Sequence, residues 1–297
     1  MPNTRKPRRE RQPPAPPDLR VAALVYDGLA TFEFGIAADV FALRRPGFEP
    51  WYDFAAVPAE PGPLRATGGV TLASDTSYSP RFEALEKAGL IIAPGWFVAP
   101  RREPPGLIAA LRRAHARGAR LLTICSGSFL LARAGLLAGK RATTHWRYLD
   151  ALARQHPDIR VERDVLYVED GNILTSAGSA AGLDCCLHLV RRDFGVAVAN
   201  KVARSLVVPP MREGGQAQYV ERPAPPAADR LSATLDWARA RLDRPILLEE
   251  GAVSVDEAAA AVGLGVDALR RHFRARLGVS PSRYRASFGA SAPARRA

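Results

Sequence analysis

The sequence has 297 residues, of which 47% are hydrophobic and 24% are charged. This balance is ordinary for a globular protein, and the length suffices for two modest domains or one large one. No apolar run approaches the roughly 20 residues that a membrane-spanning helix needs, so none is expected.

The net charge of +12 favours a polyanionic partner, nucleic acid above all, because Lys and Arg release counterions when they bind phosphates. A genome rich in G and C would raise the arginine content without any such partner. There are three cysteines, Cys125, Cys185 and Cys186, and no spacing among them suggests a zinc site. The last two are adjacent, and adjacent cysteines rarely bond each other. We therefore expect a reducing, cytoplasmic compartment, and neither a metal nor another cofactor.

Residues 1–20 are rich in Pro, Arg and Lys and are predicted to form a disordered basic tail. No apolar stretch of the signal-peptide kind accompanies them. Two interpretations stay open: a solvated tail, or an arm that adds weak affinity for DNA.

Short apolar runs follow at 21–26, 54–57, 89–94 and 119–124, with helical patterns between them. Such runs are typical of buried parallel strands. Their alternation with helices predicts an α/β domain over 21–208, with a parallel sheet covered on both faces. Residues 165–178 predict a β-hairpin around Glu-Asp-Gly-Asn, and a long helix should follow it.

The segment LLTICSGSFLLARAGLL places Cys125 between a buried strand and a turn into a helix. This strand–nucleophile–helix elbow exposes a side chain at the carboxyl edge of a sheet, and the helix N-terminus is expected to lower the pKa of the thiol. His145 and Glu33 could reach the same edge, as base and partner of a nucleophile. Three interpretations of Cys125 stay open: a sensing or ligand-binding thiol, an inert remnant of the elbow, or the nucleophile of a hydrolase or amidase.

This arrangement resembles the DJ-1/PfpI branch of the class I glutamine amidotransferase-like superfamily, over roughly residues 20–208. Cys125, His145 and Glu33 match its elbow cysteine, histidine and acid. The segment SAGSAAGLD at 176–184 matches a regulator subgroup in which this domain precedes an AraC-type one. The resemblance implies a flavodoxin-like fold and a module that senses a small-molecule effector or forms a homodimer; enzymatic activity is not the usual expectation.

Residues 209–228 are rich in Pro and Gly and are predicted to be a linker. Residues 229–297 are predicted to be a small all-α domain. Ser254 and Glu257 form a capping box before a short helix, and Gly263–Gly265 separate it from a second helix that starts near Val266.

A helix, a tight turn and a basic second helix predict a helix-turn-helix, whose second helix enters the major groove of double-stranded DNA. The residues expected to contact DNA are Val266, Asp267, Arg270, Arg271, Arg274 and Arg276. The alternative is a helical hairpin with a solvated arginine face.

The segment Leu269–Phe273 and the tail GVSPSRYRASF resemble the second helix-turn-helix of the AraC/XylS family. The resemblance implies a sequence-specific DNA-binding transcription regulator. Residues 229–297 are too few for the two helix-turn-helix units of that family, and the lead-in to the first unit is joined to the second at Ile246–Leu247. We therefore expect the first unit to be missing. Two other functions stay open: a cysteine-dependent amidase, peptidase or glyoxalase-type enzyme that uses Cys125, and a truncated sensor that only dimerises.

Overall fold

The computed structural model describes residues 18–45, 47–212, 214–220, 265–277 and 280. The strands are β1 (Arg20–Val25), β2 (Asp53–Pro58), β3 (Leu64–Arg65), β4 (Thr71–Leu72), β5 (Leu90–Pro94), β6 (Arg120–Ile124), β7 (Arg141–Ala142), β8 (Arg160–Val161), β9 (Tyr167–Asp170) and β10 (Ile173–Ser176). The α-helices are α1 (Thr31–Ala37), α2 (Glu83–Lys87), α3 (Leu107–Ala116), α4 (Ser128–Arg133), α5 (Leu149–Gln155), α6 (Ala180–Phe194), α7 (Val196–Ser205) and α10 (Val266–Leu277). The short helical turns are η1 (Ala38–Ala42), η2 (Cys125–Gly127), η3 (Trp146–Tyr148) and η4 (Gln216–Tyr219).

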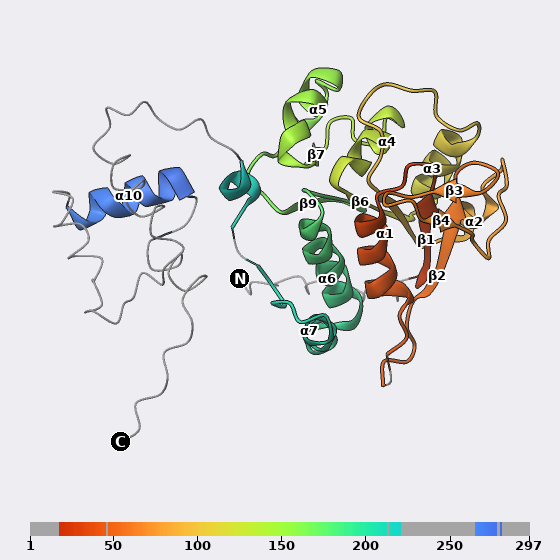
Figure 1. Ribbon diagram of the computed structural model, residues 1–297, viewed down its shortest axis with the longest axis horizontal. Coiled ribbons are helices and arrows are strands. Elements are labelled where there is room, and N and C mark those ends of the chain that lie inside the picture. The colour runs from red at the N-terminus through yellow and green to blue at the C-terminus, as the bar shows by residue number, and fades with distance from the viewer. Residues whose placement is uncertain (1–17, 46, 213, 221–264, 278–279, 281–297) are drawn as a thin grey trace, which may run out of the picture.

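Six strands form the central sheet, in the order β2-β1-β5-β6-β10-β9 (Figure 1). The first five in this order are parallel, and β9 runs antiparallel to β10. The four predicted apolar runs form β1, β2, β5 and β6, and the predicted hairpin is β9–β10. The predicted α/β fold with a mostly parallel sheet is therefore confirmed for this part of the chain.

The two faces of the sheet carry separate hydrophobic clusters, because successive side chains of a strand point to opposite faces. On β1, Val21 and Ala23 pack in a cluster with residues of α1, α6 and α7. Ala22 and Leu24 belong to the other cluster, with residues of α3, α4 and α5. The body is thus a three-layer sandwich, in which α1, α6 and α7 cover one face together (Figure 1).

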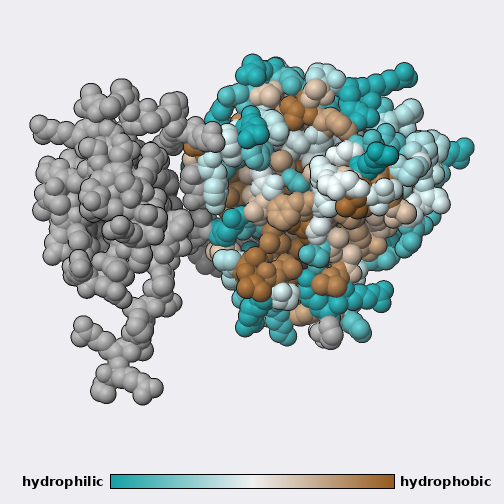
Figure 2. Space-filling model, in the orientation of Figure 1, coloured by the Kyte–Doolittle hydropathy of each residue, from teal (hydrophilic) through white to brown (hydrophobic). Residues whose placement is uncertain are grey.

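An apolar area shows on the surface of the body where α6 and α7 lie (Figure 2). The exposed apolar side chains of α7 and of the segment after it are Val196, Val207 and Met211. Among the described residues, no helix is long and apolar enough to cross a bilayer.

Several predicted features lie outside the described residues. These are the basic tail over 1–17, the helix that begins at Ser254 and the tail after Ser280. Of the predicted disordered segment, residues 18–20 are ordered: Arg20 begins β1 and pairs with Asp18.

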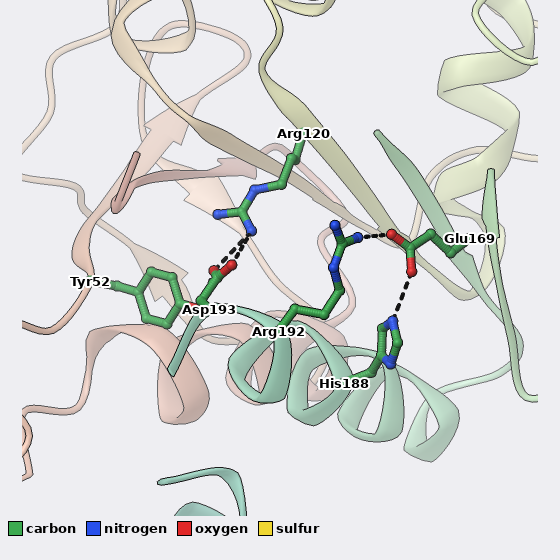
Figure 3. Close-up of polar contacts among 6 residues, drawn as sticks. All are labelled: Tyr52, Arg120, Glu169, His188, Arg192 and Asp193. Atoms are coloured by element: carbon green, nitrogen blue, oxygen red, sulfur yellow. Dashed lines mark hydrogen bonds and ion pairs between the residues drawn. The ribbon is translucent and has the colours of Figure 1, made fainter. Parts of the chain in front are cut away.

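A buried polar cluster fixes the end of α6 to the sheet (Figure 3). Arg120, at the start of β6, donates from Nη1 to both carboxylate oxygens of Asp193, at 2.6 and 2.8 Å. The Tyr52 hydroxyl donates to the same carboxylate at 2.6 Å. Only 15% of the Arg120 side chain and 5% of the Asp193 side chain are exposed. Burial, and then Asp193, raise the pKa of Tyr52, so its hydroxyl keeps its proton and remains a donor.

A second cluster holds the middle of α6 against the edge strand β9 (Figure 3). Nε2 of His188 lies 2.8 Å from Oε2 of Glu169, and Arg192 pairs with the other oxygen of that carboxylate. Both clusters pin α6 in place, and the N-terminus of this helix forms part of the candidate site described below.

Asp193→Ala should lower the free energy of unfolding by about 3 kcal/mol, because it leaves the buried Arg120 guanidinium without its counter-charge. Urea denaturation followed by circular dichroism measures the loss. Asp150→Ala is the matched control, since Asp150 pairs with Arg163 at the surface, where 69% of its side chain is exposed. Equal denaturation midpoints for the two variants would show that the buried pair contributes nothing.

Candidate functional site

The candidate site begins at Cys125, which directly follows β6 and has a left-handed backbone with φ of 57°. A residue other than glycine reaches this conformation at a cost of about 1–3 kcal/mol, and such strained residues cluster at functional sites. The turn is held from two sides. The Cys125 N–H donates to the carbonyl of Ala177 at 3.2 Å, and Oγ1 of Thr144 donates to the carbonyl of Cys125 at 2.9 Å.

Close packing behind the elbow requires a glycine two residues later. A Cβ atom on Gly127 would lie 2.2 Å from the carbonyl oxygen of Ala93, at the end of β5. Ser126 completes the turn, because its Oγ accepts from the Trp96 N–H at 3.0 Å and donates to the Trp96 carbonyl at 2.6 Å. The ends of β5, β6 and β10 therefore meet at one point on the carboxyl edge of the sheet.

The thiol of Cys125 is buried, with 9% of the residue exposed, and so is Glu33 of α1, with 8% exposed. Burial, followed by the negative charge of Glu33, raises the pKa of the thiol to about 11. Hydrogen bonds from the backbone N–H groups of Ser179 and Ser126 lower the pKa, but by less than burial and Glu33 raise it. The expected lowering of this pKa by the helix N-terminus is therefore wrong, because desolvation outweighs it. At neutral pH the thiol is protonated.

Glu33 and His145 share this edge with Cys125, but none of the hydrogen bonds among the described residues joins two of the three. Oε1 of Glu33 accepts from the hydroxyl of Ser179 at 2.8 Å, and Nδ1 of His145 accepts from the N–H of Arg147 at 3.1 Å. Burial and then Arg147 lower the pKa of His145, so the ring is neutral and carries its hydrogen on Nε2. The catalytic role of these residues stays a prediction.

The ring of His145 lies directly over Gly178, where a Cβ atom would be 2.1 Å from Cδ2 of the imidazole. A cavity of about 300 Å³ opens beside this contact. Its lining residues are His145, Trp146, Leu166, Ala177, Gly178, Ser179, Ala180, Ala181, Arg212, Gln216 and Tyr219. Of the three residues predicted for the site, His145 alone lines this cavity.

Three lining residues were missed by the sequence analysis, namely Arg212, Gln216 and Tyr219. They lie in the stretch that was predicted as a linker, where Pro209, Pro210 and the following glycines indicate only an irregular backbone. Gln216 is nonetheless 2% exposed. Composition carries no sign that such a segment folds back onto the domain. The sequence had indicated His145 and the segment 176–184, and residues 177–181 of that segment also line the cavity.

The second helix predicted near Val266 is confirmed as α10. Asp267, Arg270, Arg271 and Arg274 are exposed on it, at the helical spacing that places them on one face. Nη1 of Arg270 lies 3.4 Å from Oδ1 of Asp267, and Val266 is half-buried. The side chain of Arg276 lies outside the described residues. Three guanidinium groups on one exposed face can pair with phosphates or with guanine.

Comparison with known families assigns the α/β body. Residues 19–192 match the family model described as the DJ-1/PfpI family. The chain belongs to the DJ-1/PfpI family. The match spans the elbow, His145, Glu33 and most of α6, and it ends before Arg212, Gln216 and Tyr219 of the cavity.

Two similar proteins from Pseudomonas aeruginosa are HTH-type transcriptional regulators. CdhR is 31% identical over 185 residues, which are 62% of this chain and 54% of CdhR, so the match spans about half of that regulator. ArgR is 30% identical over 241 residues, which are 80% of this chain and 67% of ArgR. The match to ArgR extends over more of this chain than residues 19–192, which the family model covers.

Two further matches concern the DJ-1/PfpI body. The isonitrile hydratase of Pseudomonas putida is 35% identical over 185 residues, 60% of this chain and 72% of that enzyme. The crystal structure of an AraC family transcriptional regulator from Pseudomonas putida superimposes with a TM-score of 0.54 at 24% identity, over 63% of this chain and 98% of that one. The structural match shows the shared fold.

The rate at which iodoacetamide alkylates Cys125 in the folded protein should rise about tenfold per pH unit from pH 7 to 10, because only the thiolate reacts. Glu33→Gln should raise the rate at any pH in this range, since removing the negative charge lowers the pKa of the thiol. Mass spectrometry of the Cys125 peptide gives the rates, and the peptide with the fully buried Cys185 and Cys186 serves as an internal control for unfolding. A rate that is flat above pH 7 would mean that the thiol is already ionised.

Proposed function

We propose that this protein is a DNA-binding transcription regulator, in which the DJ-1/PfpI domain binds a small-molecule effector and the C-terminal segment, residues 229–297, binds DNA. One observation supports this most strongly. The similarity to the regulator ArgR covers 80% of the chain, which is more than all the residues up to Val220 together make up. The similarity therefore continues beyond the α/β body and into the C-terminal segment.

The α10 helix supplies the cations for DNA in this proposal. Arg270, Arg271 and Arg274 are exposed, and between Ala268 and the last residue the sequence has eight arginines and no acidic residue. Such a segment binds phosphates with release of counterions, and arginine also pairs with guanine in the major groove. A single helix-turn-helix contacts few phosphates, so we include a homodimer, which would place two such helices on neighbouring half-sites.

The sensing role rests on the cavity beside His145. It lies at the carboxyl edge of a parallel sheet, where α/β proteins commonly bind ligands. The thiol of Cys125 is protonated, has little exposure and does not line this cavity, so in this proposal it performs no reaction.

Replacing Arg270, Arg271 and Arg274 together by alanine should weaken binding to DNA from the gene's own upstream region at least tenfold at 0.15 M salt. The slope of log K against log salt should become shallower by about one for each lost phosphate contact. Fluorescence anisotropy with unrelated competitor DNA measures both.

The matched control replaces three exposed arginines of the α/β body, Arg44, Arg81 and Arg102, and so removes the same charge. Equal losses of affinity in the two triple variants would mean that the arginines of α10 contribute only through the overall charge of the protein. Weak, fully competed binding by the unaltered protein would favour the truncated sensor that only dimerises.

A second candidate function is a cysteine-dependent enzyme, favoured by the strained elbow at Cys125 and by the similarity to an isonitrile hydratase. Such an enzyme would add water across an isonitrile to give an N-substituted formamide. Under the regulator proposal, the protein should hydrate n-butyl isocyanide no faster than its Cys125→Ala variant, as followed by chromatography of the formamide. Turnover that is lost in Cys125→Ala would establish the enzyme instead.

A further inference from the structure

The inference concerns the segment that returns to the body after α7, residues 214–220, which we call the strap. Its turn η4 docks on the loops at the carboxyl edge of the sheet. The Ala217 N–H donates to Oδ1 of Asp164 at 2.9 Å, and Gly215 packs so closely that a Cβ atom there would lie 2.0 Å from the same oxygen. Just before the strap, Arg212 pairs with Asp184 of α6. These contacts hold the strap at a defined position on the body, and the strap forms one wall of the cavity beside His145.

Gln216 is the buried centre of the strap and is left with an unsatisfied acceptor. Its Nε2 donates to Oγ1 of Thr143 and to the carbonyl of Thr144, both at 3.1 Å. Because a carbonyl can only accept, the Thr144 contact fixes which end of the amide is nitrogen. Oε1 is then turned away from the two threonines and is buried without a hydrogen-bond partner among the described residues. Buried acceptors almost always have a partner, so a residue like this one that lines a cavity indicates a missing donor.

Other residues that line the cavity offer donors. His145 is neutral with its hydrogen on Nε2, since Nδ1 accepts from Arg147. The first residues of the 15-residue helix α6, Ala180 and Ala181, also line the cavity, and a helix N-terminus favours an acceptor or an anion. Trp146, and Tyr219 of the strap, add aromatic surface to the lining.

We propose that the cavity binds a small molecule that carries an N–H donor beside a carbonyl or carboxylate acceptor. The donor hydrogen-bonds to Oε1 of Gln216, and the acceptor faces Nε2 of His145 and the N-terminus of α6. Primary carboxamides and α-amino acids both have this chemistry. The inference rests on the proposed sensing role and specifies the effector's class. Gln216 is then the residue that selects the ligand.

The position of Gln216 also gives binding a route to the rest of the chain. The ligand satisfies a buried acceptor of the docked strap, Oε1 of Gln216, which has no partner among the described residues, so binding stabilises the docked strap. After Val220 the chain continues toward the C-terminal segment that the proposed function assigns to DNA. An effector at this site therefore acts first on the connection between the two functional parts.

Two matched pairs of probes test the ligand class on the full chain: benzamide with N,N-dimethylbenzamide, and L-phenylalanine with its N,N,N-trimethyl derivative. Within each pair only the first member has an N–H to donate. At a concentration tenfold above its Kd, a binding probe should raise the melting temperature by about 3 °C, and its methylated partner should not. Stabilisation by benzamide would identify a carboxamide as the ligand class, and stabilisation by L-phenylalanine would identify an α-amino acid.

Gln216→Met, which keeps the size of the side chain and removes its polar atoms, should abolish the difference within each pair. The control is Gln155→Met, the same substitution at an exposed position of α5, which should leave the difference intact. Hydrogen exchange gives a second readout that needs no variant: the bound probe should slow deuterium uptake in peptides covering 214–220.

Three outcomes would overturn the inference: no stabilisation by any of the four probes at 10 mM, equal stabilisation by methylated and unmethylated partners, or discrimination that survives in Gln216→Met. None of these measurements uses DNA. If the protein discriminates between the probes but does not bind DNA, the ligand site stands and the regulator proposal fails. If it binds DNA but does not discriminate between the probes, the regulator proposal stands and the ligand site fails.

Discussion

The turn at Cys125 is the constraint on which the candidate site depends. The chain leaves β6 in a left-handed conformation and must pass within van der Waals contact of β5, which only the glycine at 127 allows. The carbonyl of Ala177 and the hydroxyl of Thr144 hold this turn from opposite sides. Those two partners belong to the segments that carry Gly178 and His145. The hydrogen bonds that stabilise the strained elbow therefore also place the histidine and the start of α6 around it.

This packing separates two chemical environments that the sequence alone does not distinguish. The thiol lies in a buried site beside Glu33, where burial and the acid keep it protonated. The cavity is lined by His145, the start of α6 and the strap, and its polar lining side chains include Arg212 and Gln216. In the proposed receptor role, the strained turn places the walls of the cavity while the thiol stays protonated.

The sequence predicted the α/β body well, because buried parallel strands are recognisable as short apolar runs and a tight hairpin has its own turn residues. It also identified the elbow at Cys125 and the start of α10. It misjudged the pKa of Cys125, since desolvation depends on contacts with distant residues such as Glu33. It assigned Gln216 to a linker, because the docking of η4 depends on Thr143, Thr144 and Asp164, which no local pattern connects to it. The helix-turn-helix unit as a whole stays a prediction, with α10 its described part.

The measurement that tests the central claim most directly is chromatin immunoprecipitation of the tagged protein in its own cell, followed by sequencing. A DNA-binding regulator should be enriched at a small number of discrete sites that share a sequence motif. A variant lacking the arginines at 270, 271 and 274 should lose that enrichment at equal protein abundance. Uniform, motif-free recovery of DNA from both proteins would contradict the account and direct attention to the α/β body alone.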